Sequence, residues 1–396
     1  MSSAPLSAPP CPPLASSPAQ HWGGRLAGCL WWGLILLACA LNAQRTLAGG
    51  NPWGTGDWLI NYQGGLVRRG VPGDLLWHLT SSATGLLWSV WALQTALLVG
   101  LGARIWQLRH RLASSQSANW MLLLSPAFLA GFTAMDLSGG FRKELLGFAA
   151  YLVLDHALST ARLHRAMAML ALAAYAIAAL AHEVNALCLV FFLHPIWLAA
   201  RQRPDERQTL KMLGAGFTLI AVAGLLLSIL KPGSATTVSL ICQSLQQHGL
   251  NEAMCSGAVK WLQFDVVYGL RQVRRILLFS VLGYPWLIVL GLLPVFLYQG
   301  WAQRRTLLGL GALSLLPLFI VATDWGRWVH VLVAYMTLSL LSVARTVPLR
   351  ARPVPLVLAL VFILAWRLPH YNAEDIYAGV LWQGVQSLVS GAPAHP

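Results

Sequence analysis

The sequence predicts an all-α, polytopic integral membrane protein with about eleven transmembrane helices. Hydrophobic residue types make up 57% of the 396 residues and charged types only 10%, against about 25% charged residues in an average soluble domain. Apolar segments recur along the whole chain, and the 27 Lys and Arg residues separate these segments instead of clustering on a polar domain. These observations exclude a soluble globular enzyme and argue against a nucleic-acid partner.

Each apolar segment is a candidate for a helix that crosses the bilayer, which takes about 20 residues. The candidates are residues 26–43, 85–107, 119–135, 143–158, 166–181, 184–200, 210–230, 276–298, 306–323, 327–345 and 355–368. Several of them are only 16 to 18 residues long. Such short segments indicate helical hairpins whose tips lie below the membrane surface, or a locally thin bilayer.

The chain is expected to have three parts. Residues 1–21 contain six prolines among Ser and Ala and no charged residue, which predicts a disordered cytoplasmic tail. Residues 22–368 form the transmembrane domain, and residues 369–396 form a short outer tail. The apolar residues 26–41 also resemble a signal peptide, because Arg25 precedes them and a small-residue run around Cys39 mimics a cleavage site. A retained first helix is favoured, because the topology requires it.

Eleven crossings place alternate loops on opposite sides of the membrane, and the positive-inside rule then sets the orientation. One set of loops contains 15 Lys and Arg residues and three acids, whereas the other contains 12 basic residues and ten acids. The first set is therefore predicted to be cytoplasmic, with the N-terminus inside and the C-terminus outside. The outer set has two long loops, 44–84 and 231–275, and three short tips at 136–142, 182–183 and 324–326.

The second long outer loop contains Cys242 and Cys255. A disulfide persists in the compartment where this loop is expected to lie, so we predict that the two cysteines are joined; two free thiols are the alternative. The six cysteines show no Cys-x-x-Cys or Cys/His zinc spacing. The sequence therefore predicts no protein-bound cofactor and no metal ligands, and whether a divalent metal assists is left open.

The first outer loop combines an acid, two adjacent arginines and several glycines. It runs from Asp57 through Asn61 and Tyr62 to Arg68 and Arg69. Glycines let a backbone approach a ligand closely, and paired guanidinium groups match the oxygens of a phosphate. These features predict a phosphate-binding loop. A glycine-rich turn whose arginines bind lipid headgroups is the alternative.

The short tip at 136–142 carries Asp136 and Arg142, and Lys143 and Glu144 follow directly. Glu144 in a first helical turn is favoured by the helix dipole, whereas two cations there require anionic partners. Either a bound phosphate or the neighbouring carboxylates of Asp136 and Glu144 would supply that negative charge.

The tip at His182 and Glu183 interrupts an apolar run of 35 residues, so two antiparallel helices must turn there. An ionisable residue at membrane depth costs at least about 2.5 kcal/mol and usually faces a water-filled cavity. The pair is therefore predicted to supply a base or a substrate ligand, with a mutually satisfied structural pair as the alternative. His194, which precedes Pro195 in the returning helix, is interpreted as a core histidine at a kink.

The fourth polar cluster contains Asp324 and Arg327 between two apolar segments. Local capping by Asp324 and pairing with Arg327 would explain it. However, three tips and one loop then present acid together with base on the same face, which predicts a single cavity open to the outside. The sequence lacks a Gly-x-Ser-x-Gly elbow, a His-Glu-x-x-His zinc helix and a Gly-x-x-x-x-Gly-Lys phosphate loop.

These motifs carry a resemblance to a group of multi-span proteins of bacterial surface-polysaccharide gene clusters. The matching runs are Asn61 to Gly70, Arg142 to Glu144, His182-Glu183 and Asp324 to Arg327, in that order. The resemblance implies a role in polysaccharide assembly in the bacterial inner membrane. The layout also resembles membrane glycosyltransferases of the GT-C class, whose first outer loop carries a catalytic acid and which use polyprenyl-phosphate-linked sugars. Asp57 occupies the comparable position, although the second acid of that loop, Asp74, is 17 residues away.

The resulting hypothesis is a membrane glycosyltransferase or polysaccharide polymerase that takes a polyprenyl-(pyro)phosphate-linked glycan donor and a glycan acceptor at the outer face. Arg68, Arg69, Arg142, Lys143 and Arg327 would bind the phosphate. Asp57 is the first choice of base and Glu183 the second, with His182 beside it and support from Asn61, Tyr62, Asp136 and Asp324.

Two other functions fit some of these features. A transporter or flippase of lipid-linked oligosaccharide would use His182, Glu183 and Asp324 as a proton relay, but internal repeats are not found. A structural scaffold subunit would not require acid and base at four separate tips.

Overall fold

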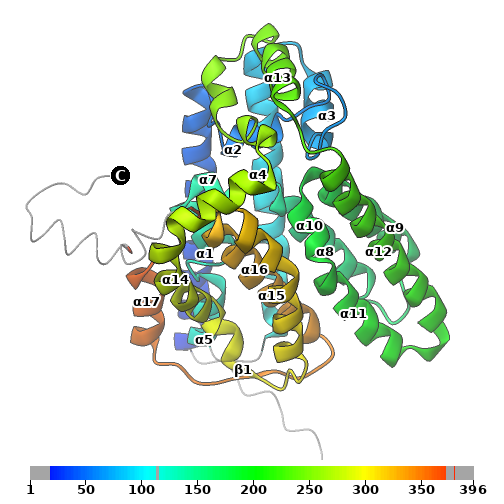
Figure 1. Cartoon of the computed structure of the whole chain (residues 1–396). Helices are drawn as coiled ribbons and strands as arrows, with labels where there is room; N and C mark the ends of the chain where they lie inside the picture. The colour runs from blue at the N-terminus through cyan, green and yellow to red at the C-terminus, as the bar shows by residue number, and fades with distance from the viewer. Residues whose placement is uncertain (1–17, 113–115, 372–378, 380–396) are drawn as a thin grey trace, which may run out of the picture.

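The structure is a bundle of α-helices with a small helical cap at one end (Figure 1). It is a computed structural model that describes residues 18–112, 116–371 and 379. Six helical segments in this part of the chain are long and apolar enough to cross a membrane. They are Arg25–Leu47, Ala83–Arg111, Glu183–Gln202, Pro204–Leu230, Arg304–Val321 and Trp325–Val343. The all-α, multi-span class is therefore confirmed, whereas the predicted number of eleven transmembrane helices is not confirmed: the described residues also contain shorter apolar helices, Arg165–Ala181, Gly283–Phe296 and Leu356–Ala365.

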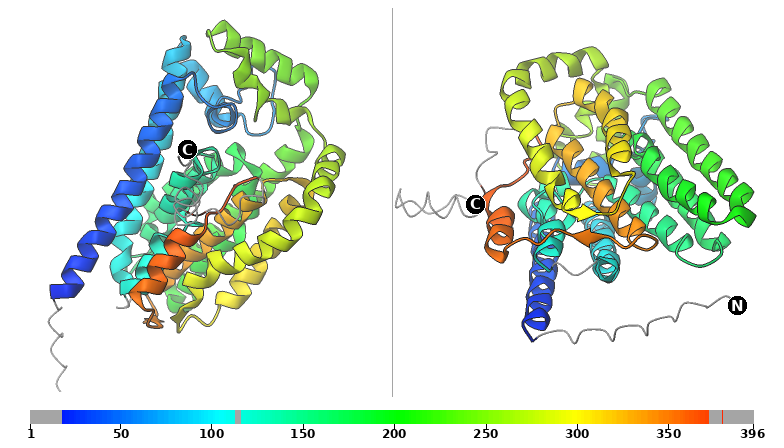
Figure 2. Two further views of the ribbon diagram at one scale, coloured as in Figure 1. Left: turned by 90° about the vertical axis from the view of Figure 1, so that its left-hand side faces the viewer. Right: turned by 90° about the horizontal axis from the view of Figure 1, so that it is seen from below.

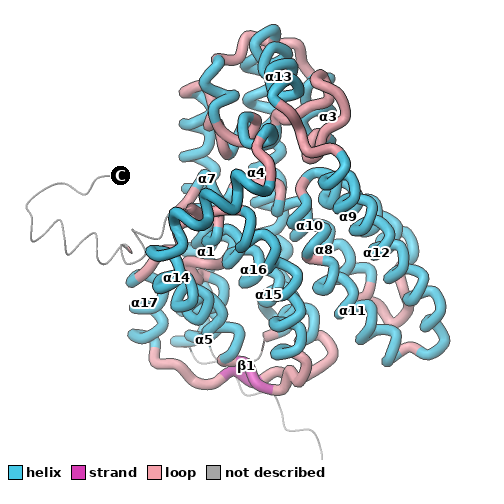
Figure 3. The backbone as a smooth tube through the Cα atoms, viewed as in Figure 1, coloured by secondary structure: helices cyan, strands magenta, loops and turns pink. Residues whose placement is uncertain are grey.

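The helices follow the predicted apolar segments closely. They are α1 (Pro18–Leu47), α2 (Gly54–Trp58), α3 (Val71–Leu79), α4 (Ala83–Leu108), α5 (Gln116–Leu123), α6 (Leu129–Met135), α7 (Leu137–Gly140), α8 (Glu144–Ala157), α9 (Arg165–Ala181), α10 (Glu183–Leu187), α11 (Leu189–Gln202), α12 (Arg207–Leu230), α13 (Ala235–Gln247), α14 (Val266–Phe296), α15 (Arg304–Val321), α16 (Trp325–Val343) and α17 (Leu356–Ala365). The strands β1 (Tyr298–Gln299) and β2 (Arg350–Ala351) pair antiparallel at the end opposite the cap, with Tyr298 facing Ala351 (Figure 3).

Two predicted segments are interrupted. The segment at 119–135 divides into α5 and α6, because Pro126 lacks an N–H donor and disfavours helical geometry at Ser125. The N–H of Phe128 instead donates to the carbonyl of Ser125 and closes a turn. The segment at 184–200 divides at Cys188 into α10 and α11.

Two helices, α1 and α14, begin well before the predicted segments. α1 includes residues 18–21, which were assigned to a disordered tail, and Pro18 is acceptable there because the first turn of a helix needs no N–H donor. The remaining tail residues, 1–17, lie outside the described part. α14 begins at Val266 rather than 276, and the carboxylate of Asp265 caps it by accepting the N–H of Tyr268 at 2.7 Å.

α16 is the central helix of the bundle, and every one of its residues is buried. Helices α8 and α11 pack against α16, with α9, α10 and α12 further out on the same side, and α14 and α15 also pack against it; α15 contacts α10 and α11 as well (Figures 1 and 2). The main hydrophobic core is contributed by all of these helices together with α1, α4 and α5. This arrangement places the N-terminal ends of α8, α10 and α16 at the cap end of the bundle.

The cap is built from the two predicted outer loops, which contain α2, α3 and α13. A second hydrophobic core, including Trp58, Ile60 and Ile241, holds the two loops together. The N–H of Arg68 donates to the carbonyl of Lys231 at 2.9 Å, which ties the first loop to the second. Cys242 and Cys255 form a disulfide within the second loop.

Candidate functional site

Asp57 lies at the bottom of the cap, on the short helix α2. Its carboxylate is completely buried, with Arg142 Nε 3.5 Å from Oδ2 and Lys143 Nζ 3.9 Å from Oδ1. In the described part of the chain, neither oxygen of Asp57 accepts a hydrogen bond. Burying a carboxylate without hydrogen bonds is unfavourable, so Asp57 is a group whose bonding capacity is available to a ligand.

A set of hydrogen bonds fixes α2 against the residues before α8. The indole N–H of Trp58 donates to the carbonyl of Phe141 at 2.9 Å. The amide of Gln94 in α4 donates to the same carbonyl at 2.8 Å and to the carbonyl of Gly54 at 3.1 Å. Gln94 in turn accepts from Asn42 of α1 at 2.8 Å. These buried contacts connect α1, α2, α4 and the α7–α8 turn, and they set the position of Asp57 opposite Arg142.

The positive charges around Asp57 dominate its ionisation. Burial by itself would raise the pKa of the carboxyl group, but the charges of Lys143 and Arg142, with a smaller contribution from Arg69, lower the pKa well below its ordinary value. Asp57 is therefore ionised at neutral pH. It can accept a proton only when a substrate weakens the influence of these cations.

Arg69 forms a two-point ion pair with Glu183 of α10. Its Nε donates to Oε2 at 2.9 Å and its Nη2 contacts Oε1. Nη1 of Arg68 lies 3.9 Å from Oε1 of the same carboxylate. The Arg69 backbone is left-handed, with φ at 67°, and Lys143 Nζ donates to its carbonyl at 2.7 Å. Strain of this kind costs about 1–3 kcal/mol and is concentrated at functional sites, so the surrounding contacts hold Arg69 in position.

A second ion-pair group forms around Arg327 at the start of α16. Its guanidinium donates to Glu144 Oε1 at 2.7 and 3.0 Å and to Asp324 Oδ2 at 2.6 Å. Asp324 makes no side-chain cap to α16. Arg327 is therefore held by a local acid and by an acid from α8, 183 residues away.

His182 joins the two ion-pair groups. Its Nε2 lies 2.9 Å from Arg327 Nη2, and its Nδ1 accepts the N–H of Val184 at 3.2 Å and lies 3.6 Å from Glu183 Oε2. A neutral ring can accept at only one of its two nitrogens, whereas a protonated ring would set donors against donors at both Nδ1 and Nε2. The buried imidazole is therefore neutral in this structure.

The predicted polar tips thus come together in one cluster beneath the cap. Five cations and four carboxylates meet there, from the cap and from the chain at the starts of α8, α10 and α16. The cations are Arg68, Arg69, Arg142, Lys143 and Arg327, and the carboxylates are Asp57, Glu144, Glu183 and Asp324. With His182 neutral, the cluster carries one excess positive charge. That excess favours an anionic ligand.

Three predicted site residues lie beside this cluster rather than in it. Asn61 donates to Ser244 Oγ at 3.2 Å and accepts the N–H of Gln63, so it connects the two cap loops. The N–H of Tyr62 donates to Asp74 at 3.2 Å. Asp136 caps α7 and pairs with His370, whose Nδ1 lies 2.6 Å from Oδ2. Asp136 therefore does not neutralise Arg142 or Lys143.

His194, interpreted as a core histidine, is partly buried beside Pro195 in α11. Its ring packs near those of Trp197 and Trp301. It lies apart from the cluster beneath the cap and belongs to the aromatic packing of the bundle.

Two glycines allow close backbone approach at the site. A Cβ atom on Gly73 would lie 2.0 Å from the carbonyl oxygen of Ile60, where the first loop folds back on itself. A Cβ atom on Gly326 would lie 1.7 Å from the carbonyl oxygen of Pro369, because the C-terminal segment crosses the start of α16. The Asp324–Arg327 motif therefore contains a glycine for a steric reason.

The residues that sequence analysis missed are those that position the cluster. The cluster is held by Gln94, described above, by Asn185 and by the backbone at Trp53. Arg142 donates to the carbonyl of Trp53 at 2.8 Å. Asn185 donates to the carbonyls of Ala178 at 2.9 Å and Lys143 at 3.3 Å. A polar amide within an apolar segment was the available signal for Gln94 and Asn185. Among the described residues, no group of three or more His, Cys, Asp or Glu side chains is placed to hold a metal ion.

Comparison with known proteins identifies the family. Residues 31–273 match the family described as "Uncharacterised membrane protein Rv1490". The chain belongs to this family. The matched range includes Asp57, Arg69, Lys143 and Glu183 but ends before α15 and α16, so Arg327 lies outside it. No curated protein and no solved structure matches the chain.

Proposed function

We propose that the protein is a glycosyltransferase or polysaccharide polymerase of the bacterial inner membrane, with a helix arrangement related to the GT-C class. In this proposal it acts at the outer face on a sugar linked to polyprenyl phosphate or pyrophosphate. The observation that carries the proposal is the Asp57 carboxylate, which is ionised, lacks hydrogen bonds and lies against Arg142 and Lys143 in a cluster with excess positive charge.

The reaction would use these groups as follows. The hydroxyl oxygen of the glycan acceptor attacks the anomeric carbon of the donor sugar, and the bond from that carbon to the phosphate oxygen breaks. The phosphate leaves with the bonding electron pair, and the hydroxyl proton passes to Asp57. A phosphate leaving group needs positive charge more than it needs an acid. Approach of the leaving phosphate to the cations would also weaken their hold on Asp57 and so raise its basicity.

Exposure suggests an order of contacts within the cluster. The side chains of Arg68, Arg69 and Glu183 are 22%, 17% and 11% exposed, whereas those of Asp57 and Lys143 are fully buried. The donor phosphate would therefore meet Arg68 and Arg69 first. The proposal requires these arginines or the loop that carries them to move aside, so that the acceptor hydroxyl reaches Asp57.

The experiment is a transfer assay with purified protein in proteoliposomes and an added polyprenyl-linked glycan, without ATP or nucleotide-sugar. Wild-type protein should lengthen or modify the glycan, and Asp57→Asn should slow the transfer by about 100-fold or more. Asp265→Asn is the matched control, since it makes the same substitution in the cap region and asparagine retains the cap of α14. The rate of this control should equal that of wild type.

Other outcomes would contradict the proposal. Movement of the glycan across the bilayer with unchanged length would indicate the flippase. A requirement for a soluble nucleotide-sugar would overturn the choice of donor. Equal rates for Asp57→Asn and Asp265→Asn would remove Asp57 as the base.

A further inference from the structure

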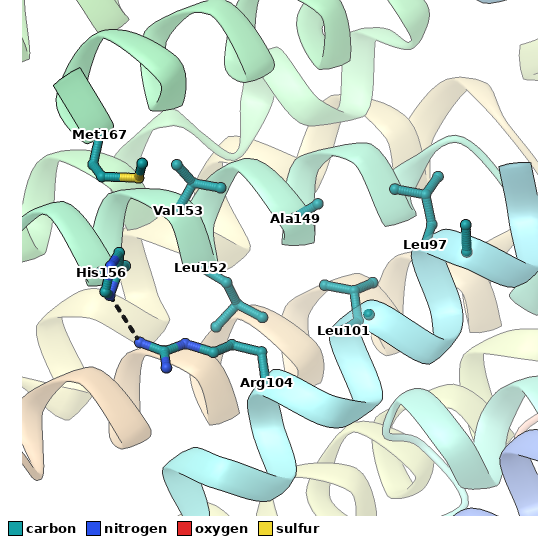
Figure 4. Close-up of a pocket in the computed structure, with 10 residues that line it drawn as sticks. Leu97, Leu101, Arg104, Ala149, Leu152, Val153, His156 and Met167 are labelled. Atoms are coloured by element: carbon teal, nitrogen blue, oxygen red, sulfur yellow. Dashed lines mark hydrogen bonds between the residues drawn. The ribbon is translucent and has the colours of Figure 1, made fainter.

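An apolar groove lies among α4, α8 and α9, on a different part of the molecule from the Asp57 cluster. Its volume is about 280 Å³, near the small end of ligand pockets, which span about 300–1,000 Å³. Figure 4 shows Leu97 and Leu101 from α4 facing Leu152 and Val153 from α8, with Met167 of α9 at one end. The walls are therefore hydrocarbon along most of the length of the groove.

The groove is open because of small residues in its walls. Ala96 and Gly100 on α4 and Ala149 on α8 all line it. A Cβ atom on Gly100 would meet no atom within 4 Å. α8 contributes only 14 residues, about 21 Å of helix against about 30 Å of bilayer hydrocarbon. At the depth of the bilayer hydrocarbon, where water is absent, an apolar groove of this kind can accommodate a hydrocarbon chain.

One end of the groove is positively charged. Arg104 and His156 lie there, with Arg104 Nη2 3.3 Å from His156 Nδ1 (Figure 4). His156 Nδ1 accepts from the guanidinium, so its Nε2 carries the proton and is available to donate. The adjacent acid, Asp155, is occupied by Arg111 at 2.9 Å and Arg345 at 3.6 Å. In the part of the chain that the structure describes, Arg104 forms no ion pair with a carboxylate.

We propose that this groove binds one acyl chain of an anionic phospholipid, with its phosphate on Arg104 and His156. The charged end of the groove lies toward β1 and β2, away from the cap, because Arg111 of the same helical segment also bonds to the carbonyl of Leu341 near the end of α16. The positive-inside rule assigns this end to the cytoplasmic leaflet, where anionic lipids are concentrated. The inference does not depend on the proposed transferase activity.

Native mass spectrometry of the purified full-length protein tests the proposal, with 1-palmitoyl-2-oleoyl phosphatidylglycerol and the matching phosphatidylcholine as probes. Wild-type protein should bind one phosphatidylglycerol about tenfold more tightly than phosphatidylcholine, since charge-assisted hydrogen bonds to the phosphate of a net-anionic lipid are not offset by a choline charge. Arg104→Gln should weaken phosphatidylglycerol binding about tenfold and leave phosphatidylcholine binding unchanged.

Gly100→Phe should weaken the binding of both lipids, because its ring would fill the groove. Gly309→Phe is the matched control: a Cβ atom on Gly309 also meets nothing within 4 Å, but this residue lies on α15, away from the groove. Equal binding by wild type, Gly100→Phe and Gly309→Phe would overturn the site. Equal binding of the two lipids by wild type would overturn the assignment of an anionic headgroup. If Arg104→Gln does not fold, the comparison of Gly100→Phe with Gly309→Phe still tests the groove as the binding site, and the comparison of the two lipids on wild-type protein still tests the headgroup.

Discussion

Replacing Glu183 by Gln tests the energetic importance of the Arg69 ion pair. The substitution preserves the shape of the side chain and one acceptor oxygen, but it removes one of the four negative charges in a cluster with five cations. Glu183 is the two-point partner of Arg69 and lies 3.9 Å from Arg68. Breaking a buried ion pair by removing one partner costs about 3–5 kcal/mol. Because Gln still accepts one hydrogen bond from Arg69, a loss of about 2–3 kcal/mol in the free energy of unfolding is expected.

The assay is reversible unfolding in mixed detergent and SDS micelles, combined with a double-mutant cycle between Glu183→Gln and Arg69→Gln. The coupling energy should be about 2 kcal/mol for this pair and below about 1 kcal/mol for Glu183→Gln with Arg68→Gln, whose contact is longer and more exposed. Glu252→Gln, at an exposed position of the cap, is the control and should change the free energy by less than about 0.5 kcal/mol.

A coupling energy below about 0.5 kcal/mol between Glu183 and Arg69 would refute this reasoning. It would mean that the left-handed Arg69 backbone is held by the hydrogen bond from Lys143 and not by the ion pair. A mutant that retains most of its stability but loses transfer activity would instead assign Glu183 a role in the reaction.

Three further predictions concern other parts of the structure. The pKa of Asp57 is lowered in the folded protein, so its ionised form stabilises the fold at pH values above the unfolded-state pKa of about 3.9. This stabilisation is lost as the pH falls toward the pKa of the folded protein. The free energy of unfolding, measured from pH 7 to pH 3, should therefore depend less on pH in Asp57→Asn than in wild type. Replacing Cys242 and Cys255 by Ser should lower the stability of the cap by about 3 kcal/mol, as expected for a loop of this length, and hydrogen exchange of residues 235–262 should report the loss. Gly326→Ala should cost about 1–3 kcal/mol, because its Cβ atom would overlap the carbonyl oxygen of Pro369; an unchanged thermal midpoint would show that the C-terminal segment does not pack there.

The class of the protein follows from the sequence alone. A bilayer provides no hydrogen-bond partners for the backbone, so each long apolar segment must be helical. The predicted segments accordingly coincide with helices, from α1 to α17, apart from breaks such as the one at Pro126. The polar sites can also be recognised from the sequence. A charged side chain is costly within an apolar segment that lies in the membrane, so motifs such as His182-Glu183 are conspicuous without any structural information.

Tertiary structure decides which acid pairs with which base. Arg69 and Glu183 are 114 residues apart, and Arg327 and Glu144 are 183 residues apart. From the sequence, Asp136 and Glu144 were the local candidates for partners of the cations at 142 and 143, with a bound phosphate as the alternative, whereas the folded chain places Asp57 there. Helical and apolar periodicity report only contacts between near neighbours in the chain. The pairings in this cluster depend on the angles and distances at which α2, α8, α10 and α16 pack, and only the folded bundle sets those.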